Sequence, residues 1–159
     1  QSGEESSIIR NRHNPSMLLR LELFQPIDGG ILSIISGGSL LVNGDFNMEN
    51  VFFGAGMFGK SSIIAEYVHT DKSDYQQTDN GAIDFGYRLH PALLLSFRAE
   101  RGVTLFTRIF GKGDVYTNQS VFGAQIFVFP HLEIRPEYRI VDTENYRATR
   151  YAVQIHLFY

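Results

Sequence analysis

The amino-acid sequence predicts an all-β fold, an antiparallel up-and-down transmembrane β-barrel, from three observations. Apolar residues recur at every second position in several runs of about ten residues, the length that a tilted membrane strand needs. Turns containing Gly or Pro separate these runs. The last residues of the sequence form one more alternating run, and its final residue is aromatic. Together these patterns favour strands that each present one apolar and one polar face.

The alternation is clearest in residues 131–141. The apolar half of that segment consists of Leu132, Ile134, Tyr138 and Ile140, and the other half of Glu133, Arg135, Glu137 and Arg139. The same pattern predicts strands at 16–24, 61–70, 81–89 and 92–101, and weaker versions predict strands at 30–43, 50–58, 120–129 and 147–159. We therefore expect nine strands, or ten if residues 6–10 contribute one.

Two kinds of connection separate the expected strands. Short turns are predicted at 58–60, 89–91 and 129–131, and long polar loops at 71–80, 102–119 and 142–146. Short turns on one rim and longer loops on the other are typical of outer-membrane barrels. The glycine pair at 29–30 predicts a further turn, and the pair at 37–38 a β-bulge.

A single domain is expected over residues 1–159, with residues 1–14 as a polar N-terminal segment or loop. Nine strands would place the two ends of the chain on opposite rims, whereas bacterial barrels have even strand numbers with both ends periplasmic. This favours the C-terminal part of a larger barrel of about 16 to 18 strands over a complete small one.

Composition argues against several other functions. A net charge of -3 and a pI near 5.9 offer no basic surface for nucleic acid. The chain has no Cys, and its five His residues are scattered without the spacing of a metal site. No serine-hydrolase elbow is present, and Ser96 would meet His69 only by an accident of register. Three acidic residues in the loop at 71–80 fit a solvated loop better than a calcium site. We expect no enzyme activity, no catalytic residue, no cofactor and no metal.

The polar halves of the strands supply the candidate pore-lining residues. Arginines and carboxylates alternate there in nearly equal numbers, as on the wall of a crowded lumen. The candidates are Arg20, Glu22, Glu66, Asp84, Arg88, Arg98, Glu100, Glu133, Arg135, Glu137 and Arg139. We also expect the groups on 133–139 to join Arg98 and Glu100 in one network. Aromatic residues predicted near strand ends suit the two membrane interfaces: Tyr67, Tyr87, Tyr138, Tyr151 and Tyr159.

The last strand carries the most specific pattern. In YAVQIHLFY the apolar face consists of Tyr151, Val153, Ile155, Leu157 and Tyr159. This run resembles the C-terminal strand by which bacterial outer-membrane barrels are recognised by their assembly machinery. The resemblance implies the outer membrane as the location, and its lipid and the barrel-assembly machinery as partners. It also implies that Tyr159 lies at the periplasmic rim, which places all three predicted short turns on that same rim.

Segments such as FGYRLHPALLLSFRAE resemble the hairpins of phosphate-selective porins. This resemblance implies a porin-like channel for passive diffusion of small solutes. The ladder of basic residues that anion selectivity requires is missing, so phosphate selectivity is not expected. The alternatives are a structural or partner-binding barrel in an envelope complex, and a soluble β-domain.

The predicted loop at 102–119 contains five large apolar residues, so it should pack against something. Folding into the barrel would place Arg108 and Lys112 at a constriction. Packing outward would instead make a homo-oligomer or envelope-partner contact.

Overall fold

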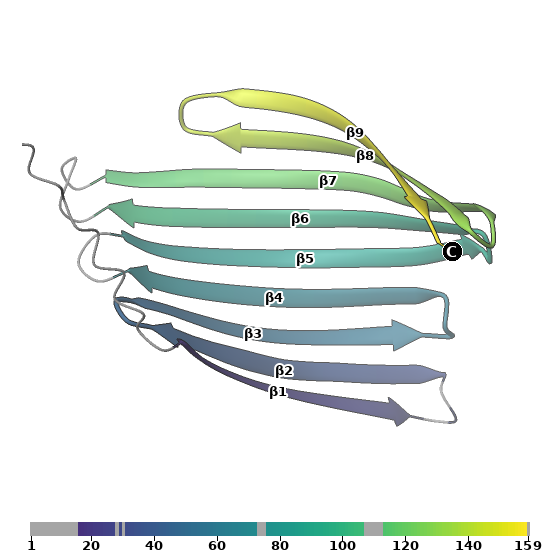
Figure 1. Cartoon of the computed structure of the whole chain (residues 1–159), viewed down its shortest axis with the longest axis horizontal. Coiled ribbons are helices and arrows are strands. Elements are labelled where there is room, and N and C mark those ends of the chain that lie inside the picture. Colours follow the sequence, from purple (N-terminus) through teal and green to yellow (C-terminus); the bar gives the residue numbers. More distant parts are fainter. Residues whose placement is uncertain (1–15, 28, 30, 73–75, 107–112, 159) are drawn as a thin grey trace, which may run out of the picture.

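The computed structural model describes residues 16–27, 29, 31–72, 76–106 and 113–158. These residues form nine strands: β1 (Ser16–Ile27), β2 (Leu32–Asn43), β3 (Phe46–Met57), β4 (Ser61–Lys72), β5 (Gln76–His90), β6 (Leu93–Phe106), β7 (Gly113–Phe129), β8 (Leu132–Thr143) and β9 (Arg147–Leu157). All nine lie in one sheet in sequence order, and each pairs antiparallel with the next (Figure 1). The sheet is not closed, so β1 and β9 are its edges.

The predicted all-β, up-and-down arrangement of nine antiparallel strands is confirmed. Each predicted strand overlaps one observed strand. The possible strand at 6–10 lies outside the described residues, as do the N-terminal residues 1–14.

The predicted long loops at 71–80 and 102–119 are wrong for most of their length, whereas residues 144–146 of the third loop do lie outside the strands. Residues 102–106 extend β6 and residues 113–119 extend β7, where Val103 pairs with Tyr116 and Leu105 with Asp114. In the same way, residues 71–72 belong to β4 and 76–80 to β5, and β8 continues to Thr143. Cross-strand hydrogen bonding continues the ladders beyond the segments in which apolar and polar residues alternate most clearly. Residues 73–75 and 107–112 lie outside the described part.

The two rims of the sheet can be told apart by the end of β9. The C-terminal rim carries the turns at 58–60, 91–92 and 130–131, so the prediction that the short turns share this rim is confirmed (Figure 1). The opposite rim also has a tight connection, at Gly44 and Asp45, where Gly44 adopts a positive φ of 58°. The sequence Asn-Gly-Asp marks this turn, but the interpretation above overlooked it.

The predicted bulge at the second glycine pair is also wrong. The register of β2 with both neighbours runs through Gly37 and Gly38 without a shift, and the irregularities lie at 88–90 and 127–129 instead. A Cβ on Gly37 would come within 2.6 Å of the Phe52 ring and 2.5 Å of the Leu21 carbonyl oxygen. Glycine is needed here for close approach, with an aromatic ring covering the gap.

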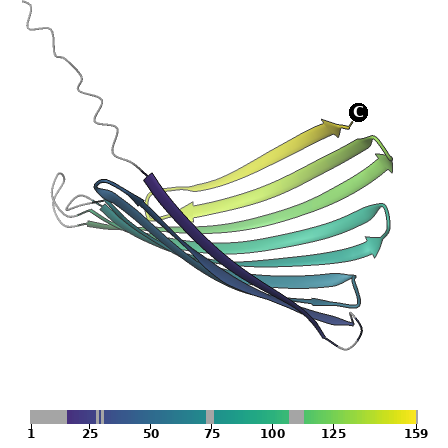
Figure 2. The same cartoon turned by 60° about the horizontal axis from the view of Figure 1, so that its bottom comes forward.

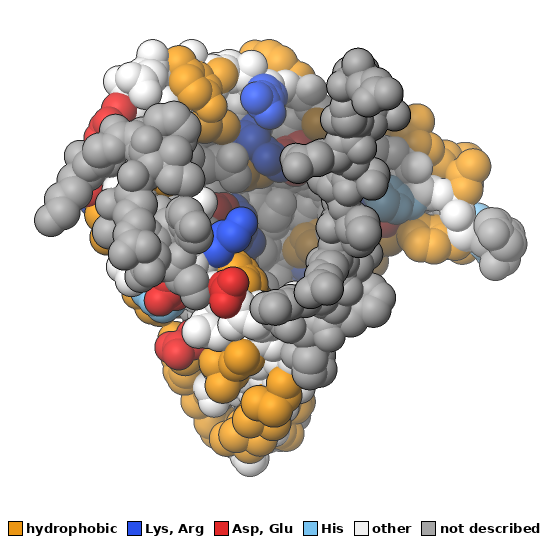
Figure 3. All heavy atoms as spheres, turned by 60° about the vertical axis from the view of Figure 1, so that its left-hand side comes forward, with side chains coloured by type: hydrophobic (Ala, Val, Ile, Leu, Met, Phe, Trp, Pro, Cys, Tyr) orange, Lys and Arg blue, Asp and Glu red, His pale blue; other side chains and the backbone are white. Residues whose placement is uncertain are grey.

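The sheet is strongly curved, so that its strands form a trough (Figure 2). Viewed from the opposite rim, charged side chains lie in the hollow and hydrophobic side chains around the outside (Figure 3). Among the described residues, Ala82 is the only buried hydrophobic side chain, with 6% exposure. The sheet therefore has no apolar core on either side, and most of its large hydrophobic residues are exposed.

Within the described residues, no helix has the length and hydrophobicity that a membrane crossing would require.

Candidate pore wall and outer surface

The strand register divides the side chains into two faces. We call the polar face the one that carries Arg20, Glu66, Arg98 and Glu137, and the apolar face the one that carries Leu21, Phe53, Phe97 and Val153. Because opposed residues in a sheet point to the same side, the register assigns all eleven candidate pore-lining residues to the polar face. The sequence did not establish this for separate strands, since each alternation alone could have faced either way.

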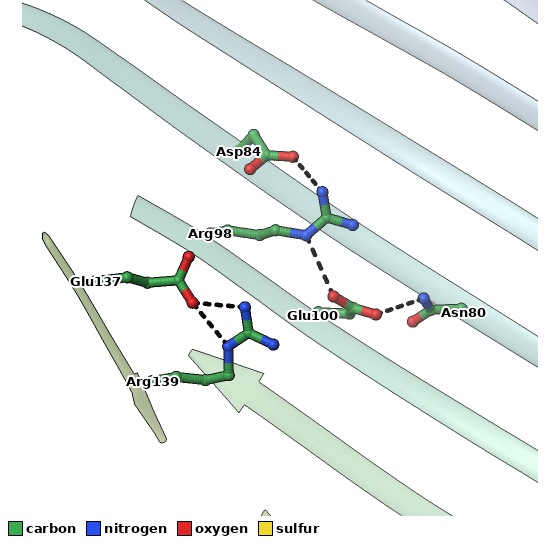
Figure 4. A network of polar contacts seen from close by, with 6 residues as sticks. All are labelled: Asn80, Asp84, Arg98, Glu100, Glu137 and Arg139. Atoms are coloured by element: carbon green, nitrogen blue, oxygen red, sulfur yellow. Dashed lines mark hydrogen bonds and ion pairs between the residues drawn. The ribbon is translucent and has the colours of Figure 1, made fainter. Parts of the chain in front are cut away.

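The largest polar network spans β5 and β6 (Figure 4). The Arg98 guanidinium donates to Asp84 Oδ2 at 3.1 Å on β5 and to Glu100 Oε2 at 3.2 Å on its own strand. The Asn80 amide donates to the other Glu100 oxygen at 2.7 Å. The bridging arginine therefore holds two carboxylates, one on each strand, in a fixed arrangement on the polar face.

The remaining networks are mostly pairs two residues apart on one strand, a spacing that places both side chains on the same face. Arg139 donates twice to Glu137 Oε1, at 2.5 and 3.0 Å. Arg135 binds both carboxylate oxygens of Glu133. Arg20 donates to Glu22 at 3.0 Å, in an exposed pair on β1. Four of the five arginines among the eleven candidates thus contact a carboxylate.

The expected network between β6 and β8 does not form. The register places Val121 of β7 directly between Arg98 and Arg139, and no hydrogen bond or ion pair among the described residues crosses β7 to join the two groups. Figure 4 shows them as separate clusters. The physical reason is the intervening strand, whose polar-face residue here is apolar.

Several residues of the polar face were not singled out from the sequence. The Asn50 amide donates to Glu66 at 2.5 Å, and Arg150 lies directly opposite Arg139 in the β8–β9 register. Arg88, by contrast, was among the predicted candidates. It lies near the C-terminal rim, where it lines a hollow of about 410 Å³ together with Pro91, Leu94, Gln125 and Phe127. The period-two alternation would have found Asn50 and Arg150, had it been extended to amides and to the last strand.

The apolar face carries a band of exposed apolar side chains that runs obliquely to the strands. On β1 the band covers Met17–Leu23, whereas on β9 it covers Tyr151–Leu157. Followed through the register, the centre of the first run corresponds to residue 146, about eight residues from the centre of the second. At about 3.3 Å per residue and about 4.8 Å per strand, the band crosses eight strand spacings at about 35°.

Aromatic rings form a ladder inside this band. Phe85, Phe97, Phe122, Tyr138 and Tyr151 are opposed in register on five consecutive strands. Adjacent ring centroids lie 4.9 Å apart for Phe97 and Phe122, and 5.0 Å apart for Tyr138 and Tyr151. Tyr138 and Tyr151 therefore lie within their strands, so placing them near strand ends was wrong. The ladder stiffens the apolar face across β5–β9.

A polar cluster lies beyond the band, toward the opposite rim. Asp79 Oδ1 accepts hydrogen bonds from the Tyr67 hydroxyl at 2.5 Å and contacts His69 Nδ1 at 2.7 Å. The hydrogen bond to Asp79 raises the pKa of His69 above its usual value, and the bonds from Tyr67 and His69 lower the pKa of Asp79. Sequence reasoning missed this cluster because it assigned Asp79 to a loop. His69 and Ser96 lie on opposite faces and do not form a pair.

The residues of the C-terminal pattern fall where the alternation places them. Tyr151, Val153, Ile155 and Leu157 share the apolar face of β9 and are exposed. Tyr159, Arg108 and Lys112 lie outside the described residues, so the last residue of the pattern and the candidate constriction have no structural account.

The described residues contain no group of three or more His, Cys, Asp or Glu side chains placed to hold a metal ion. In comparisons with known proteins, no family model matches the sequence, and no curated protein and no solved structure matches it significantly.

Proposed function

We propose that this chain forms the wall of a porin-like β-barrel in a bacterial outer membrane, where it lets small solutes diffuse passively. The observation that carries the proposal is the exposed apolar band with its slope of about 35° to the perpendicular of the strands. Strands of membrane barrels tilt by about 35–45°, so a hydrophobic layer of constant height must cross them at this angle. The slope combines hydrogen-bonded register with side-chain hydrophobicity, two properties that are independent of each other.

A soluble β-domain is the competing interpretation. In such a domain one face of the sheet would be covered by a second layer, and contiguous exposed apolar patches would rarely exceed a few hundred Å². Here exposed large hydrophobic residues occur on seven of the nine strands, all but β2 and β8, and on both edge strands. Lipid is the covering that needs no second layer of protein.

The polar face supports a water-filled interior. Four of its arginines, Arg20, Arg98, Arg135 and Arg139, are held by neighbouring carboxylates, so the wall presents fixed charges of both signs to water and small solutes. Opposite charges this close leave little net potential along the wall. We therefore propose weak ion selectivity and no preference for phosphate.

The same self-pairing also favours a second candidate, a structural or partner-binding barrel within an envelope complex. Paired charges that satisfy one another would line a plugged interior as well as an open one. A measurable single-channel conductance of the protein in planar bilayers supports the channel. A protein that inserts fully but conducts no ions supports the structural barrel.

Two free edges require closure, because unpaired backbone groups in lipid cost several kcal/mol each. We propose that the sheet belongs to a larger barrel, of about 16 to 18 strands, and that β9 is the strand recognised by the barrel-assembly machinery. Outer-membrane lipid, that machinery and further envelope proteins or protein copies are its proposed partners.

Spin labels test the membrane-facing assignment. Single cysteines at Ile83 and Phe85 should give labels accessible to oxygen dissolved in lipid. A label at Asp84, which lies between them in sequence but on the polar face, should instead be accessible to a water-soluble relaxation reagent. Equal accessibility of all three positions to the water-soluble reagent would overturn the membrane proposal.

The pore assignment is tested separately by charge reversal. In an open barrel, Arg139→Glu should shift the reversal potential toward cations, because it replaces a positive charge by a second negative charge beside Glu137. Arg147→Glu on the apolar face serves as the control and should leave the potential unchanged. If Arg139→Glu also left it unchanged in a conducting barrel, this residue would not line the pore.

A further inference from the structure

A shallow hollow of about 370 Å³ lies on the apolar face between β5 and β7. Its lining on this face consists of Gly81, Ile83, Ala99, Arg101, Asn118 and Ser120. Gly81, Ala99 and Ser120 are small, and they lie one or two register rows away from the ring ladder of Phe85, Phe97 and Phe122. The aromatic rings therefore project farther from the sheet than the small side chains that form the floor of the hollow.

The glycine in this hollow is not required by packing. A Cβ on Gly81 would meet no atom within 4 Å, and its φ is not in the left-handed region. This contrasts with Gly37, where a Cβ would collide with backbone and ring. The space above Gly81 is therefore open, and a ligand on the outer surface can occupy it.

Arg101 lies at one end of the hollow, at the boundary of the apolar band. Along β6, Ala99 belongs to the band, whereas Asp79 on the neighbouring β5 already forms the polar cluster beyond it, together with His69 of β4. The Arg101 guanidinium lies 5.9 Å from the centroid of the Tyr116 ring. A guanidinium stacked on an aromatic ring keeps its N–H edges free to donate to a planar or tetrahedral anion.

Two residues near Arg101 affect whether it can bind an anion. Asn118 is directly opposite Arg101 in the register, and its side-chain amide adds a donor on the same face. Asp79, two residues from Gly81 on that face, already accepts hydrogen bonds from Tyr67 and His69. Its negative charge is thereby engaged with partners on β4 and not directed at Arg101.

We propose that this hollow binds a membrane lipid, with an acyl chain over Gly81 and Ala99 and its phosphate on Arg101 and Asn118. The inference rests on the proposed membrane location and adds the class of lipid, one that carries a phosphate. Charge complementarity selects it, because Arg101 at the boundary of the band meets lipid phosphates at headgroup level while the small-residue floor meets the chain.

Native mass spectrometry of the delipidated full protein in detergent tests this site. The probes are dipalmitoyl phosphatidic acid and dipalmitoyl glycerol, which differ only in the phosphate. The wild-type protein should retain phosphatidic acid at least about tenfold better than the diacylglycerol. Arg101→Gln should abolish that preference, and Gly81→Phe should weaken binding of both lipids by filling the hollow. Equal retention of the two probes by the wild-type protein would overturn the proposal.

Arg147→Gln provides the matched control, since Arg147 lies on the same face in the same hydrogen-bonded row, next to Asp142. It should leave the phosphatidic acid preference intact, and an equal loss in both arginine variants would overturn the site. Displacement of the lipid by inorganic phosphate alone would overturn the lipid as the ligand. Oxygen accessibility at Ile83 in each variant reports membrane insertion independently, so failure of the lipid site is distinguishable from failure of the membrane location.

Discussion

Glu133 is the most deeply buried charged side chain of the described residues, with 1% exposure, and Arg135 binds both its oxygens. The exposed pair Arg20–Glu22 on β1 has the same two-residue spacing, but its side chains are 62% and 42% exposed. The same spacing of an arginine and a glutamate along a strand therefore gives one ion pair with a buried carboxylate and one that is exposed to solvent. The difference comes from the position of each strand in the sheet.

Replacing Glu133 by Gln should lower the free energy of unfolding by about 1–3 kcal/mol, because it leaves the Arg135 guanidinium without its charged partner beside a buried amide. Urea unfolding in detergent micelles measures the change. The matched variant Glu22→Gln should change it by less than about 1 kcal/mol, since exposed pairs contribute little. Equal effects of the two substitutions would show that burial does not distinguish the pairs.

The contact between His69 and Asp79 predicts a pH dependence at the opposite rim, outside the band that crosses the apolar layer. The hydrogen bond to Asp79 raises the pKa of His69 above 6.5, so its contribution to stability is complete below pH 6.5 and is lost as the pH rises through the higher folded-state pKa. The pKa of Asp79 is lowered from 3.8, so its contribution is present above pH 3.8 and is lost as the pH falls through the lower folded-state pKa. The cluster should hold most firmly between these limits.

An NMR titration of the His69 ring measures this shift. The wild-type midpoint should lie above 6.5, and Asp79→Asn should bring it down. Asp71→Asn is the control, because it removes a weaker, purely coulombic influence and should lower the midpoint less. A midpoint unaffected by Asp79→Asn would mean that the two side chains do not interact in solution.

At the scale of single elements, β9 separates the two faces most sharply. Ile155 lies on the apolar face and Gln154 on the polar face, as adjacent residues of an edge strand. Ile155→Arg should block insertion, because an arginine facing lipid costs about 2–4 kcal/mol near the midplane. Gln154→Arg should insert normally. Heat-modifiable gel mobility reports insertion, and normal mobility of Ile155→Arg would contradict the assignment of this face to lipid.

The central glycine of β2 gives a second prediction at this scale. Gly37→Ala should destabilise the sheet by about 1–3 kcal/mol, since the added methyl group collides with Phe52 and with the β1 backbone. Gly81→Ala, in another strand, should be neutral within about 0.5 kcal/mol because nothing lies within reach. Thermal or urea unfolding in micelles compares them, and equal costs would show that the close approach at Gly37 is not retained in solution.

On the scale of the whole molecule, the directions of the edge strands limit how the sheet can close. Strands β1 and β9 both run from the opposite rim to the C-terminal rim, because the nine strands alternate in direction. Direct pairing of these edges would therefore be parallel, both within one copy and between copies that share an orientation in the membrane. To close an antiparallel barrel, each of these two edge strands must pair with a further strand that runs in the opposite direction.

Disulfide trapping tests this in a chain that has no cysteine of its own. Cysteine pairs placed along β1 and β9, for example at Leu21 and Val153, should not cross-link under mild oxidation in the inserted protein. The positive control is a pair at Leu19 and Leu40, which are opposed in the β1–β2 register. Rapid cross-linking between the edges would show instead that the nine strands close on themselves.

The alternation along the chain was enough to predict the nine strands and which residues of each strand share a face. A period of two is a local property of extended backbone, so segments such as 131–141 specify their two faces without any neighbour. The sequence also predicted the short turns of the C-terminal rim, where Pro or Gly interrupts the ladder. The extensions of β5, β6 and β7 were missed, because hydrogen bonding to a neighbour, and not residue type, holds them in the sheet.

How the faces of different strands combine became clear from the pairing of the strands in the folded sheet. The register placed eleven separated charged residues on one face, put Val121 between two expected partners, and brought Asp79 onto Tyr67 and His69. It also revealed the slope of the apolar band and the hollow beside Arg101. These features depend on the offset between strands, which cross-strand hydrogen bonds and side-chain packing fix across residues far apart in the chain.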